Sequence, residues 1–276
     1  MKQPSTAPVL LVSDLPAWGR VALASAIPLI EKAGFQACAL PTALLSTHGA
    51  YPGFVLEPQS RFLDAAWKHL KSLGVTFAGV AVGLVGDLQQ FPVLEDIAAT
   101  VKAGGGLVLV DPILGDNGKR YGLFHDDYVP AFRSLLSLAD IITPNLTEAA
   151  LLLDHAPDLA PRSEAETAQW TRSLATLGPR RVVLTSAPFF DRPGTTGVAW
   201  YDSTYDRFGT VNHARIEGGL PGTGDALAAR LFASLLSGKR FGQAVDHAVR
   251  GTLADFRRSR AAKRPPLWGL GGSLRP

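Results

Sequence analysis

Short apolar runs alternate along the chain with longer stretches in which apolar residues recur at helical spacing. The apolar runs predict buried strands at 9–12, 35–40, 77–82, 107–110, 141–142 and 181–184. Helical spacing predicts helices over 18–33, 62–73, 94–103, 129–138, 148–153, 163–177, 226–236 and 241–256. Two further segments, 198–201 and 207–211, are typical of an antiparallel hairpin.

The order of these elements indicates the fold class. Strands alternate with helices nearly throughout, and most strands are continuous apolar runs, which is typical of a parallel sheet covered on both faces. We therefore predict an α/β fold with three layers, in which helices flank a mostly parallel central sheet. No linker-like stretch interrupts the pattern, so we expect a single domain over residues 1–276, with a core at about 9–256 and a tail at 257–276.

Composition narrows the classes of protein only slightly. The 276 residues are 46% hydrophobic with a formal net charge of +3, which is too mild to indicate a nucleic-acid partner. A single cysteine, Cys38, excludes an intrachain disulfide. The first residues lack a signal-peptide pattern, and the run at 9–12 is too short to span a bilayer. We expect a cytoplasmic protein with no membrane partner.

A glycine-dense loop from Gly218 to Asp225 leads directly into the predicted helix at 226–236. Glycines allow close approach of the backbone, and the N–H groups at a helix N-terminus attract anions. Asp225 in such a loop could accept a proton from an attacking hydroxyl while the N–H groups hold a phosphoryl group. The alternative is that Asp225 only caps the helix.

Polar residues also follow most of the predicted strands, where ligands of such sheets bind. They include Asp14 after the first strand, and Ser46, Thr47, His48 and Tyr51 in a predicted loop at 41–53. Asp111 follows the strand at 107–110, and Glu148 lies one helical turn after Asn145. Carboxylate and amide oxygens near a phosphate site are suited to Mg²⁺. Alternatively, Asp111 forms an Asp-Pro turn and Glu148 complements a helix dipole.

Several of these motifs, in this order, resemble one known family. The motifs are Leu40–Gly49, Asp111–Asp116, Ala139–Ala149, Val182–Ser186 and Gly222–Asp225. Together they resemble the ribokinase-like superfamily, and within it the pyridoxal and pyridoxamine (vitamin B6) kinases. The resemblance spans residues 9 to 256 and implies an ATP-dependent kinase that phosphorylates the hydroxymethyl group of a B6 vitamer. Relatives are commonly dimers, so it also implies a homodimer.

The resemblance further implies a role for each candidate residue. Asp225 would be the catalytic base, and the N–H groups of Gly222, Thr223 and Gly224 would form the anion hole. Mg²⁺ would be organised by Asn145 and Glu148, with Asp111 nearby. The nucleotide would contact Asp116, Thr143, Thr185 and Ser186. The substrate side would comprise Asp14, Ser46, Thr47, His48 and Tyr51.

The sequence departs from the family pattern on the substrate side only. The family carries a Ser-x-Gln-Ser-type segment after the first strand, where this chain has Ser13-Asp14, and it more often has Thr-Gly where this chain has Gly49-Ala50. A hydroxymethylpyrimidine or another small alcohol therefore remains an alternative substrate. A nucleotide- or vitamin-binding protein without catalysis is a further alternative.

Overall fold

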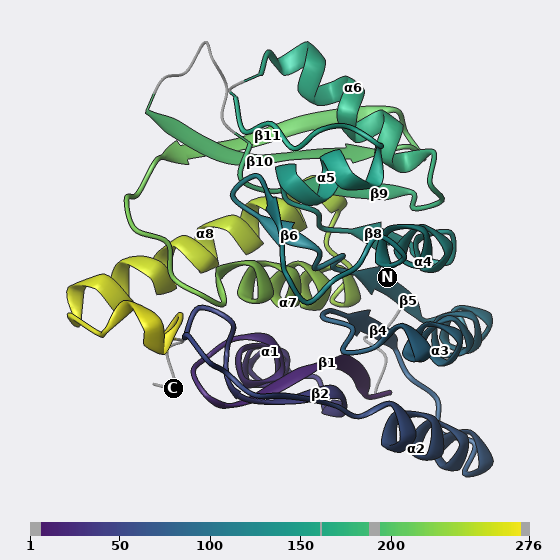
Figure 1. Cartoon of the computed structure of the whole chain (residues 1–276). Coiled ribbons are helices and arrows are strands. Elements are labelled where there is room, and N and C mark those ends of the chain that lie inside the picture. Colours follow the sequence, from purple (N-terminus) through teal and green to yellow (C-terminus); the bar gives the residue numbers. More distant parts are fainter. Residues whose placement is uncertain (1–6, 161, 188–193, 272–276) are drawn as a thin grey trace. The chain divides into compact units, whose positions relative to one another are not determined.

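The computed structural model describes residues 7–160, 162–187 and 194–271 (Figure 1). Within this part of the chain the residues group into two compact units. Unit 1 spans residues 1–107 and 218–276, and unit 2 spans residues 108–217. A single domain over 1–276 stays a prediction.

The strands of unit 1 follow the order β4-β1-β2-β3. They are β4 (Gly79–Val82), β1 (Val9–Trp18), β2 (Ala37–Thr47) and β3 (Leu56–Pro58). β1 pairs in parallel with both β4 and β2, whereas β3 pairs antiparallel with β2. The segment Val9–Val12 is almost inaccessible to solvent because it is the central strand of this unit and is covered on both faces.

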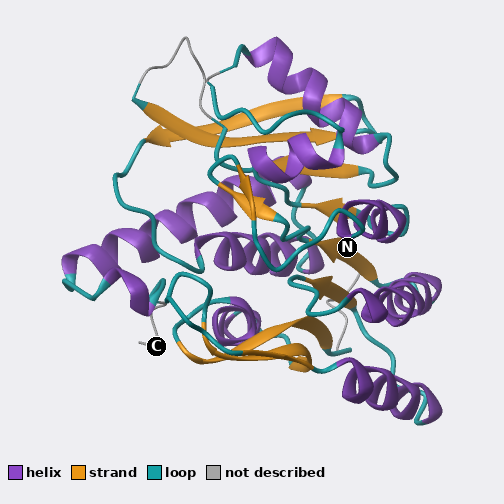
Figure 2. Ribbon diagram, in the orientation of Figure 1, coloured by secondary structure: helices purple, strands orange, loops and turns teal. Residues whose placement is uncertain are grey.

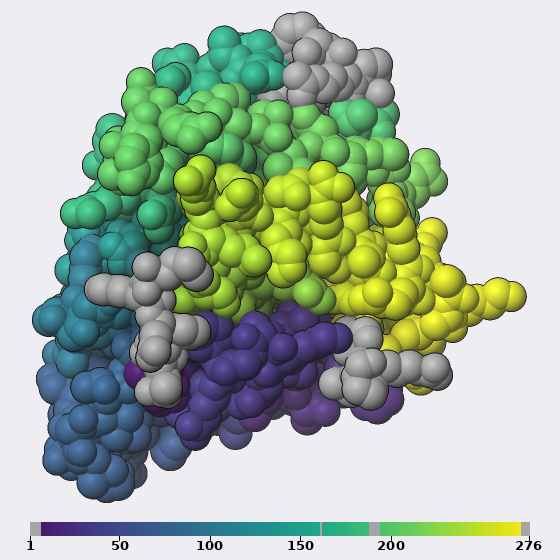
Figure 3. Space-filling model, turned by 180° about the vertical axis from the view of Figure 1, so that it is seen from behind, coloured from purple at the N-terminus to yellow at the C-terminus, as the bar shows by residue number. Residues whose placement is uncertain are grey.

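In the described part of the chain, unit 1 contains helices from both of its segments, and Figure 2 draws them in purple like all other helices. They are α1 (Ala22–Lys32), α2 (Ser60–Ser72), α3 (Phe91–Ala103), α7 (Thr223–Leu236) and α8 (Phe241–Ala261), with 3-10 turns η1 (Leu88–Gln90) and η2 (Pro266–Trp268). α7 packs against both α1 and α8. The face of unit 1 that these three helices form is seen in Figure 3, with α1 in purple and α7 and α8 in yellow-green to yellow.

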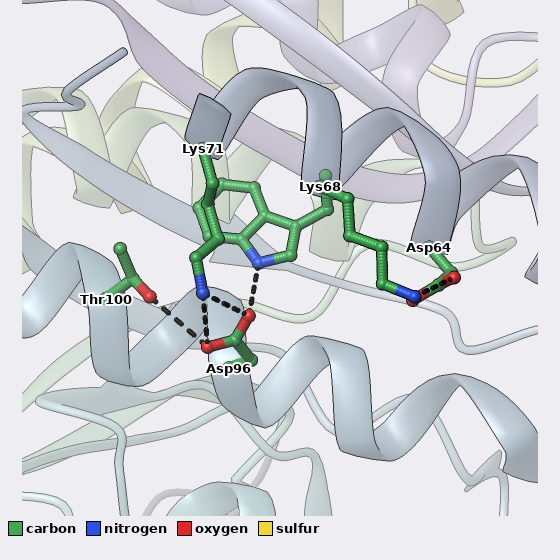
Figure 4. Close-up of polar contacts among 6 residues, drawn as sticks. Asp64, Lys68, Lys71, Asp96 and Thr100 are labelled. Atoms are coloured by element: carbon green, nitrogen blue, oxygen red, sulfur yellow. Dashed lines mark hydrogen bonds and ion pairs between the residues drawn. The ribbon is translucent and has the colours of Figure 1, made fainter. Parts of the chain in front are cut away.

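A small polar cluster fastens α2 to α3 (Figure 4). The buried Trp67 donates its indole N–H to Asp96 over 2.7 Å, and Lys71 forms an ion pair with the same carboxylate at 2.9 Å. The Lys71 ammonium is the main reason that the pKa of Asp96 lies below its usual range. Since this cluster uses ordinary hydrogen-bond pairing at the surface, it fixes helix placement and is not a candidate site.

The strands of unit 2 follow the order β11-β10-β9-β8-β5. They are β5 (Leu107–Val110, within unit 2 from Val108), β8 (Ile141–Ile142), β9 (Arg181–Leu184), β10 (Thr195–Asp202) and β11 (Arg207–Ala214), and a separate ribbon joins β6 (Gly115–Asp116) to β7 (Lys119–Arg120). The pairs β5–β8 and β8–β9 are parallel, and β10 is antiparallel to its neighbours β9 and β11. The helices are α4 (Tyr128–Leu136), α5 (Leu146–Leu152) and α6 (Glu164–Ala175).

The predicted α/β class, with a mostly parallel sheet flanked by helices, is confirmed. The hairpin expected at 198–201 and 207–211 is present as β10 and β11. A capping box begins α6, because Ser163 and Glu166 bond each other's backbone N–H groups. None of the described helices combines the length and the apolar character that a membrane span requires.

Three expectations about the chain near the predicted site are wrong. The loop expected at 41–53 is strand as far as Thr47, because Leu44 and Leu45 pair with Leu15 and Pro16 of an equally extended β1. The helix expected from residue 18 therefore begins only at Ala22. The last helix continues to Ala261, past the expected end at 256, and a bridge between Arg20 and Gly269 then joins the following segment to the turn before α1.

Candidate active site

The glycine-dense loop ends at the N-terminus of α7 in a left-handed turn. Gly222 is the N-cap of α7 with φ of 84°, a conformation that favours glycine. A Cβ atom at this position would also overlap the backbone carbonyl of Arg20. The loop is tied down by Thr223, whose hydroxyl donates to the carbonyl of Leu220 over 2.6 Å. Both constraints explain why this position carries glycine.

The backbone N–H groups of Gly222, Thr223 and Gly224 have no acceptor within the described part of the chain. Helices leave their first N–H groups unpaired, and the dipole of α7 adds positive potential at the same point. Three unpaired donors at the start of a 14-residue helix can therefore hold an anionic oxygen. This is the arrangement expected for an anion hole.

Asp225 lies in the first turn of α7, next to these donors. Burial raises the pKa of its carboxyl above the usual range, and a hydrogen bond from the backbone N–H of Ala22 opposes the shift. Ala22 itself has φ of 46°, which is uncommon for a residue other than glycine. The strained start of α1 thus brings an N–H group to the carboxylate and fixes its orientation.

Asp14 is a buried carboxylate near the half-buried Asp225. It is 3% exposed, and the Ser13 hydroxyl donates to its Oδ1 over 3.2 Å. Burial, followed by the negative charge of Asp225, raises the pKa of Asp14 to about 7. Unit 1 therefore places two carboxylates close enough to influence each other beside the anion hole.

Of the two hydroxyl residues at the end of β2, only Thr47 presents an unpaired group. Its Oγ1 is buried and has no hydrogen-bond partner among the described residues. Buried hydroxyls normally have a partner, so this one is suited to a ligand. The Ser46 hydroxyl instead accepts the Val55 N–H over 2.8 Å and holds β2 to the following loop.

His48 and Tyr51 are engaged by the chain itself. The Nδ1 atom of His48 accepts the Ala50 N–H at 3.3 Å, so its Nε2 carries the hydrogen that bonds the Leu267 carbonyl at 2.7 Å. Tyr51 lies edge-on to the His48 ring, with centroids 5.0 Å apart, and its hydroxyl accepts the Trp18 indole N–H. His48 therefore offers a substrate its ring surface rather than a ring nitrogen.

In unit 2, Asn145 and Glu148 form a capping box at the start of α5. The Asn145 side chain accepts the Glu148 N–H at 3.0 Å, and Glu148 Oε2 accepts the Asn145 N–H at 2.8 Å. The other carboxylate oxygen of Glu148 accepts the Leu114 N–H at 3.2 Å. The expected placement of both residues on one side of a helical turn is confirmed.

The remaining candidates of unit 2 gather around this capping box. Thr143 donates its hydroxyl to Asp111 over 2.8 Å, and the Thr185 N–H donates to the Pro144 carbonyl over 2.8 Å. Ser186 follows with φ of 56°. Asp116 is exposed on β6, where the Asn117 N–H donates to it over 2.8 Å. Hydrogen bonds thus join Thr143 to Asp111 and Asn145 to Glu148. Because Thr143 and Asn145 are only two residues apart in the sequence, the two pairs lie together.

The acidic residues of unit 2 suit a magnesium ion that is held mainly by water and phosphate. Burial raises the pKa of Glu148 well above its usual range, and the Asp111 carboxylate adds to this shift. A cation nearby would relieve that repulsion. No group of three or more His, Cys, Asp or Glu side chains in the described ranges could hold a metal alone. Mg²⁺ commonly uses one or two carboxylates besides waters and substrate phosphates, so the residues fit that mode.

Sequence reasoning missed the residues that hold the unit 1 site together. Ala22 orients Asp225, Arg20 lies against Gly222, and the carbonyl of Leu267 holds His48. All three act through backbone atoms, which leave no trace in a residue-type pattern. In the sequence, only the residue type of Gly19 was a signal of this packing. The structure shows why glycine is needed there, since a Cβ would meet the His48 ring at 2.6 Å.

Comparison with known proteins identifies the family. The sequence model described as phosphomethylpyrimidine kinase matches residues 30–263. The chain belongs to this kinase family. It is 31% identical to a pyridoxine/pyridoxal/pyridoxamine kinase of Bordetella bronchiseptica, over 97% of this chain and 94% of that protein. The resemblance to ribokinase-like vitamin B6 kinases is thus confirmed.

Solved structures agree with this assignment. A protein described as a phosphomethylpyrimidine kinase from Bacteroides thetaiotaomicron, solved with pyridoxal, is 33% identical and has a TM-score of 0.91, covering 96% of this chain and 93% of that one. A pyridoxal kinase from Lactobacillus plantarum is 29% identical with a TM-score of 0.85, covering 97% and 94%. The chain is therefore a pyridoxal kinase-like phosphotransferase in family and fold.

Proposed function

We propose that this protein transfers the γ-phosphoryl group of ATP to the hydroxymethyl group of a vitamin B6 vitamer: pyridoxal, pyridoxine or pyridoxamine. The observation that carries the proposal is the position of Asp225, in the first turn of α7 beside three unpaired backbone N–H groups. The relatives named as B6 vitamer kinases, one of them aligned over 97% of this chain, support the choice of substrate.

Asp225 acts as the general base in this proposal. Burial raises its pKa, which makes the carboxylate a stronger proton acceptor, and the Ala22 N–H keeps it oriented. As the hydroxymethyl oxygen attacks in line, its proton passes to Asp225, and the N–H groups of Gly222, Thr223 and Gly224 stabilise the charge on the phosphoryl oxygens. Positioning and electrostatics supply most of the barrier reduction.

Two groups of unit 1 are suited to the substituted ring. The free Thr47 hydroxyl can donate or accept one hydrogen bond. Asp14 can do either near neutral pH, because its pKa is raised to about 7. His48 and Tyr51 contribute ring surfaces, and Ser46 supports the loop after β2.

The nucleotide side uses residues of unit 2. Asp111, Asn145 and Glu148 would hold Mg²⁺ through water and phosphate oxygens, where the ion would offset phosphate charge. Thr143, Asp116, Thr185 and Ser186 would contact the nucleotide. A homodimer and a cytoplasmic location belong to the same proposal and rest on the family resemblance.

Turnover against a panel of alcohols tests the proposal. ADP release is followed with ATP, Mg²⁺ and, in parallel, pyridoxal, pyridoxine, pyridoxamine and hydroxymethylpyrimidine, and the phosphorylated product is identified by mass. We expect kcat/KM for at least one B6 vitamer to exceed that for the pyrimidine by about 10-fold or more. Binding of a vitamer without ADP release would contradict the proposal and favour a non-catalytic binding protein.

A second candidate substrate is hydroxymethylpyrimidine. The family description supports it, since the matching family model is named for phosphomethylpyrimidine kinase. The same panel separates the two candidate substrates, because it measures turnover of each. A preference for the pyrimidine would change the substrate but leave the proposed mechanism the same.

A further inference from the structure

Unit 1 contains a cavity of about 440 Å³ whose lining includes none of the site residues predicted from the sequence. It lies where the turn between β1 and α1 meets the segment after α8. Its lining comprises two tryptophans, two arginines and three small or apolar residues: Trp18, Gly19, Arg20, Ala24, Pro28, Arg264 and Trp268. The volume falls in the range of small-molecule sites.

Both arginines of this cavity lack a carboxylate partner among the described residues. By contrast, Arg230 and Arg258 of the neighbouring helices α7 and α8 both pair with Asp255. Arg20 and Arg264 are each partly buried, so two like charges border one cavity, and no described carboxylate pairs with either of them. Guanidinium groups bind phosphate in a fork geometry, and two of them match a doubly charged group.

The two tryptophans give the cavity an aromatic wall. Their rings meet edge to face, with centroids 5.7 Å apart and planes at 85°. Trp18 is 50% exposed and Trp268 is 41% exposed, which is high for indoles held in fixed positions. Perpendicular rings leave one face and one edge for a third ring, which prefers such offset or edge-to-face packing.

The backbone around the cavity is well fixed. The Arg20 N–H donates to the Trp268 carbonyl over 3.1 Å, and Gly269 forms a bridge with Arg20. The Leu270 N–H donates to the Pro221 carbonyl over 2.9 Å. The tail that follows α8 is therefore a structured wall of this cavity, and a ligand would find the site largely preformed.

We propose that this cavity binds a planar aromatic molecule that carries a phosphate monoester. The ring would pack against Trp18 and Trp268, and the phosphate would bond to Arg20 and Arg264. Two sources share this chemistry: a phosphorylated pyridine, such as the proposed reaction would release, and a nucleoside monophosphate. Binding itself does not depend on the proposed function.

Two contacts connect the cavity to the candidate active site. Trp18 donates its indole N–H to Tyr51, which packs on His48. The backbone of Arg20 lies against Gly222, the N-cap of α7. A bound ligand would therefore stabilise the loop and helix start that hold the site, and its effect on turnover rests on the proposed function.

Calorimetric binding to the full chain tests the proposal. The probes are phenyl phosphate, pyridoxine 5′-phosphate, adenosine monophosphate, inorganic phosphate and pyridoxine. The wild type is compared with Arg20→Gln/Arg264→Gln and with the control Arg61→Gln/Arg257→Gln. The control removes the same charge from two exposed arginines outside the cavity.

We expect phenyl phosphate to bind the wild type and the control equally, and to bind Arg20→Gln/Arg264→Gln about 10-fold or more weakly. Inorganic phosphate and pyridoxine should each bind the wild type about 10-fold or more weakly than pyridoxine 5′-phosphate does. Of pyridoxine 5′-phosphate and adenosine monophosphate, the one that binds with the higher affinity then identifies the biological source of the ligand. Equal loss in the control, no binding to the wild type, or equal affinity for inorganic phosphate would overturn the proposal.

A second variant guards against failure of the double variant to fold. Trp268→Ala removes the aromatic wall but keeps the main-chain bond from Arg20 to residue 268. It should weaken phenyl phosphate about 10-fold while leaving the affinity for inorganic phosphate unchanged. Unchanged affinity for phenyl phosphate would overturn the proposal. All of these experiments measure binding and none measures turnover. Failure of the proposed kinase activity would therefore not affect their outcome.

Discussion

Asp14 in unit 1 and Glu148 in unit 2 are both buried carboxylates, yet the chain treats them differently. Burial and a second carboxylate raise the pKa of each, Asp225 in one case and Asp111 in the other. Glu148 accepts two backbone N–H bonds that fix both of its oxygens. Asp14 accepts a hydrogen bond from the Ser13 hydroxyl, which itself accepts the Leu84 N–H, and one from its own backbone N–H. Glu148 is therefore part of the scaffold, and we propose that Asp14 is the carboxylate that meets a ligand.

This contrast matches the two tasks of the proposed reaction. A residue that organises a metal and its phosphates needs a fixed position, which a capping box supplies. A residue that meets the substrate's ring needs a free oxygen and a proton that can move near neutral pH. In the proposed reaction, unit 2 would supply rigidity and unit 1 would supply the chemistry.

The largest expected effect comes from the unit 1 base. Asp225→Asn keeps the shape of the side chain but cannot accept the proton, so we expect turnover to fall about 1000-fold. Nucleotide affinity should change little. Turnover is measured by ADP release and affinity by calorimetry on the same preparations. Near-normal turnover would remove Asp225 as the base.

The next effect concerns stability and its dependence on pH. The folded-state pKa of Asp14 is raised to about 7. Between the ordinary pKa of an aspartate and pH 7, the folded protein therefore keeps a proton on Asp14 that the unfolded chain has lost. The wild type thus loses stability as pH rises from about 4 to about 7. Asp14→Asn avoids this loss and should be more stable above pH 7, by at most roughly 4 kcal/mol.

Urea unfolding at pH 4, 6 and 8 measures this difference. The stability gained by Asp14→Asn should be smallest at pH 4 and largest at pH 8. Asp127→Asn, at an exposed position with the same charge change, is the matched control. A gain that does not vary with pH would show that Asp14 is not the titrating group.

A third change tests the turn that presents the anion hole. Gly222→Ala places a methyl group against the Arg20 carbonyl in a left-handed turn, and we expect a loss of about 2 kcal/mol or more of unfolding free energy. Gly219→Ala is the matched control in the same loop, because a Cβ there meets no atom within 4 Å. Equal unfolding free energies for the two variants would contradict the account.

The smallest expected effect tests the rigidity of unit 2. Glu148→Gln replaces one acceptor oxygen by a donor, so it leaves the N–H of Asn145 or of Leu114 unpaired. We expect the free energy of unfolding to fall by about 1–3 kcal/mol. The Mg²⁺ concentration that gives half-maximal turnover should rise by about 10- to 100-fold.

Glu166→Gln makes the same change in the exposed capping box of α6 and should lose only about 0.5 kcal/mol. Thermal unfolding of both variants provides the comparison. If the two losses are equal, burial of Glu148 does not matter, and the contrast with Asp14 fails.

The sequence was informative wherever chemistry follows residue type. The order of strands and helices, the hairpin of β10 and β11 and the turn joining Asn145 to Glu148 were all predictable, because apolar periodicity and capping residues are local signals. The glycine loop was predictable for the same reason, since its glycines precede a strongly periodic helix.

What could not be predicted depends on long-range backbone pairing. The loop expected at 41–53 is strand to Thr47 because β1 and β2 extend together past a register shift between Ser13 and Leu15. Pro41 looks like a strand terminator in the sequence, yet it is tolerated beside this irregularity. The hold of Leu267 on His48 joins residues 219 positions apart, which no local pattern reveals.

The most direct test of the central claim is a crystal structure with pyridoxine and a non-transferable ATP analogue. The account predicts the substrate's hydroxymethyl oxygen about 2.6–3.2 Å from the Asp225 carboxylate, with the terminal phosphate on the N–H groups of Gly222, Thr223 and Gly224. A hydroxymethyl group bonded elsewhere, with Asp225 turned away from both ligands, would contradict it.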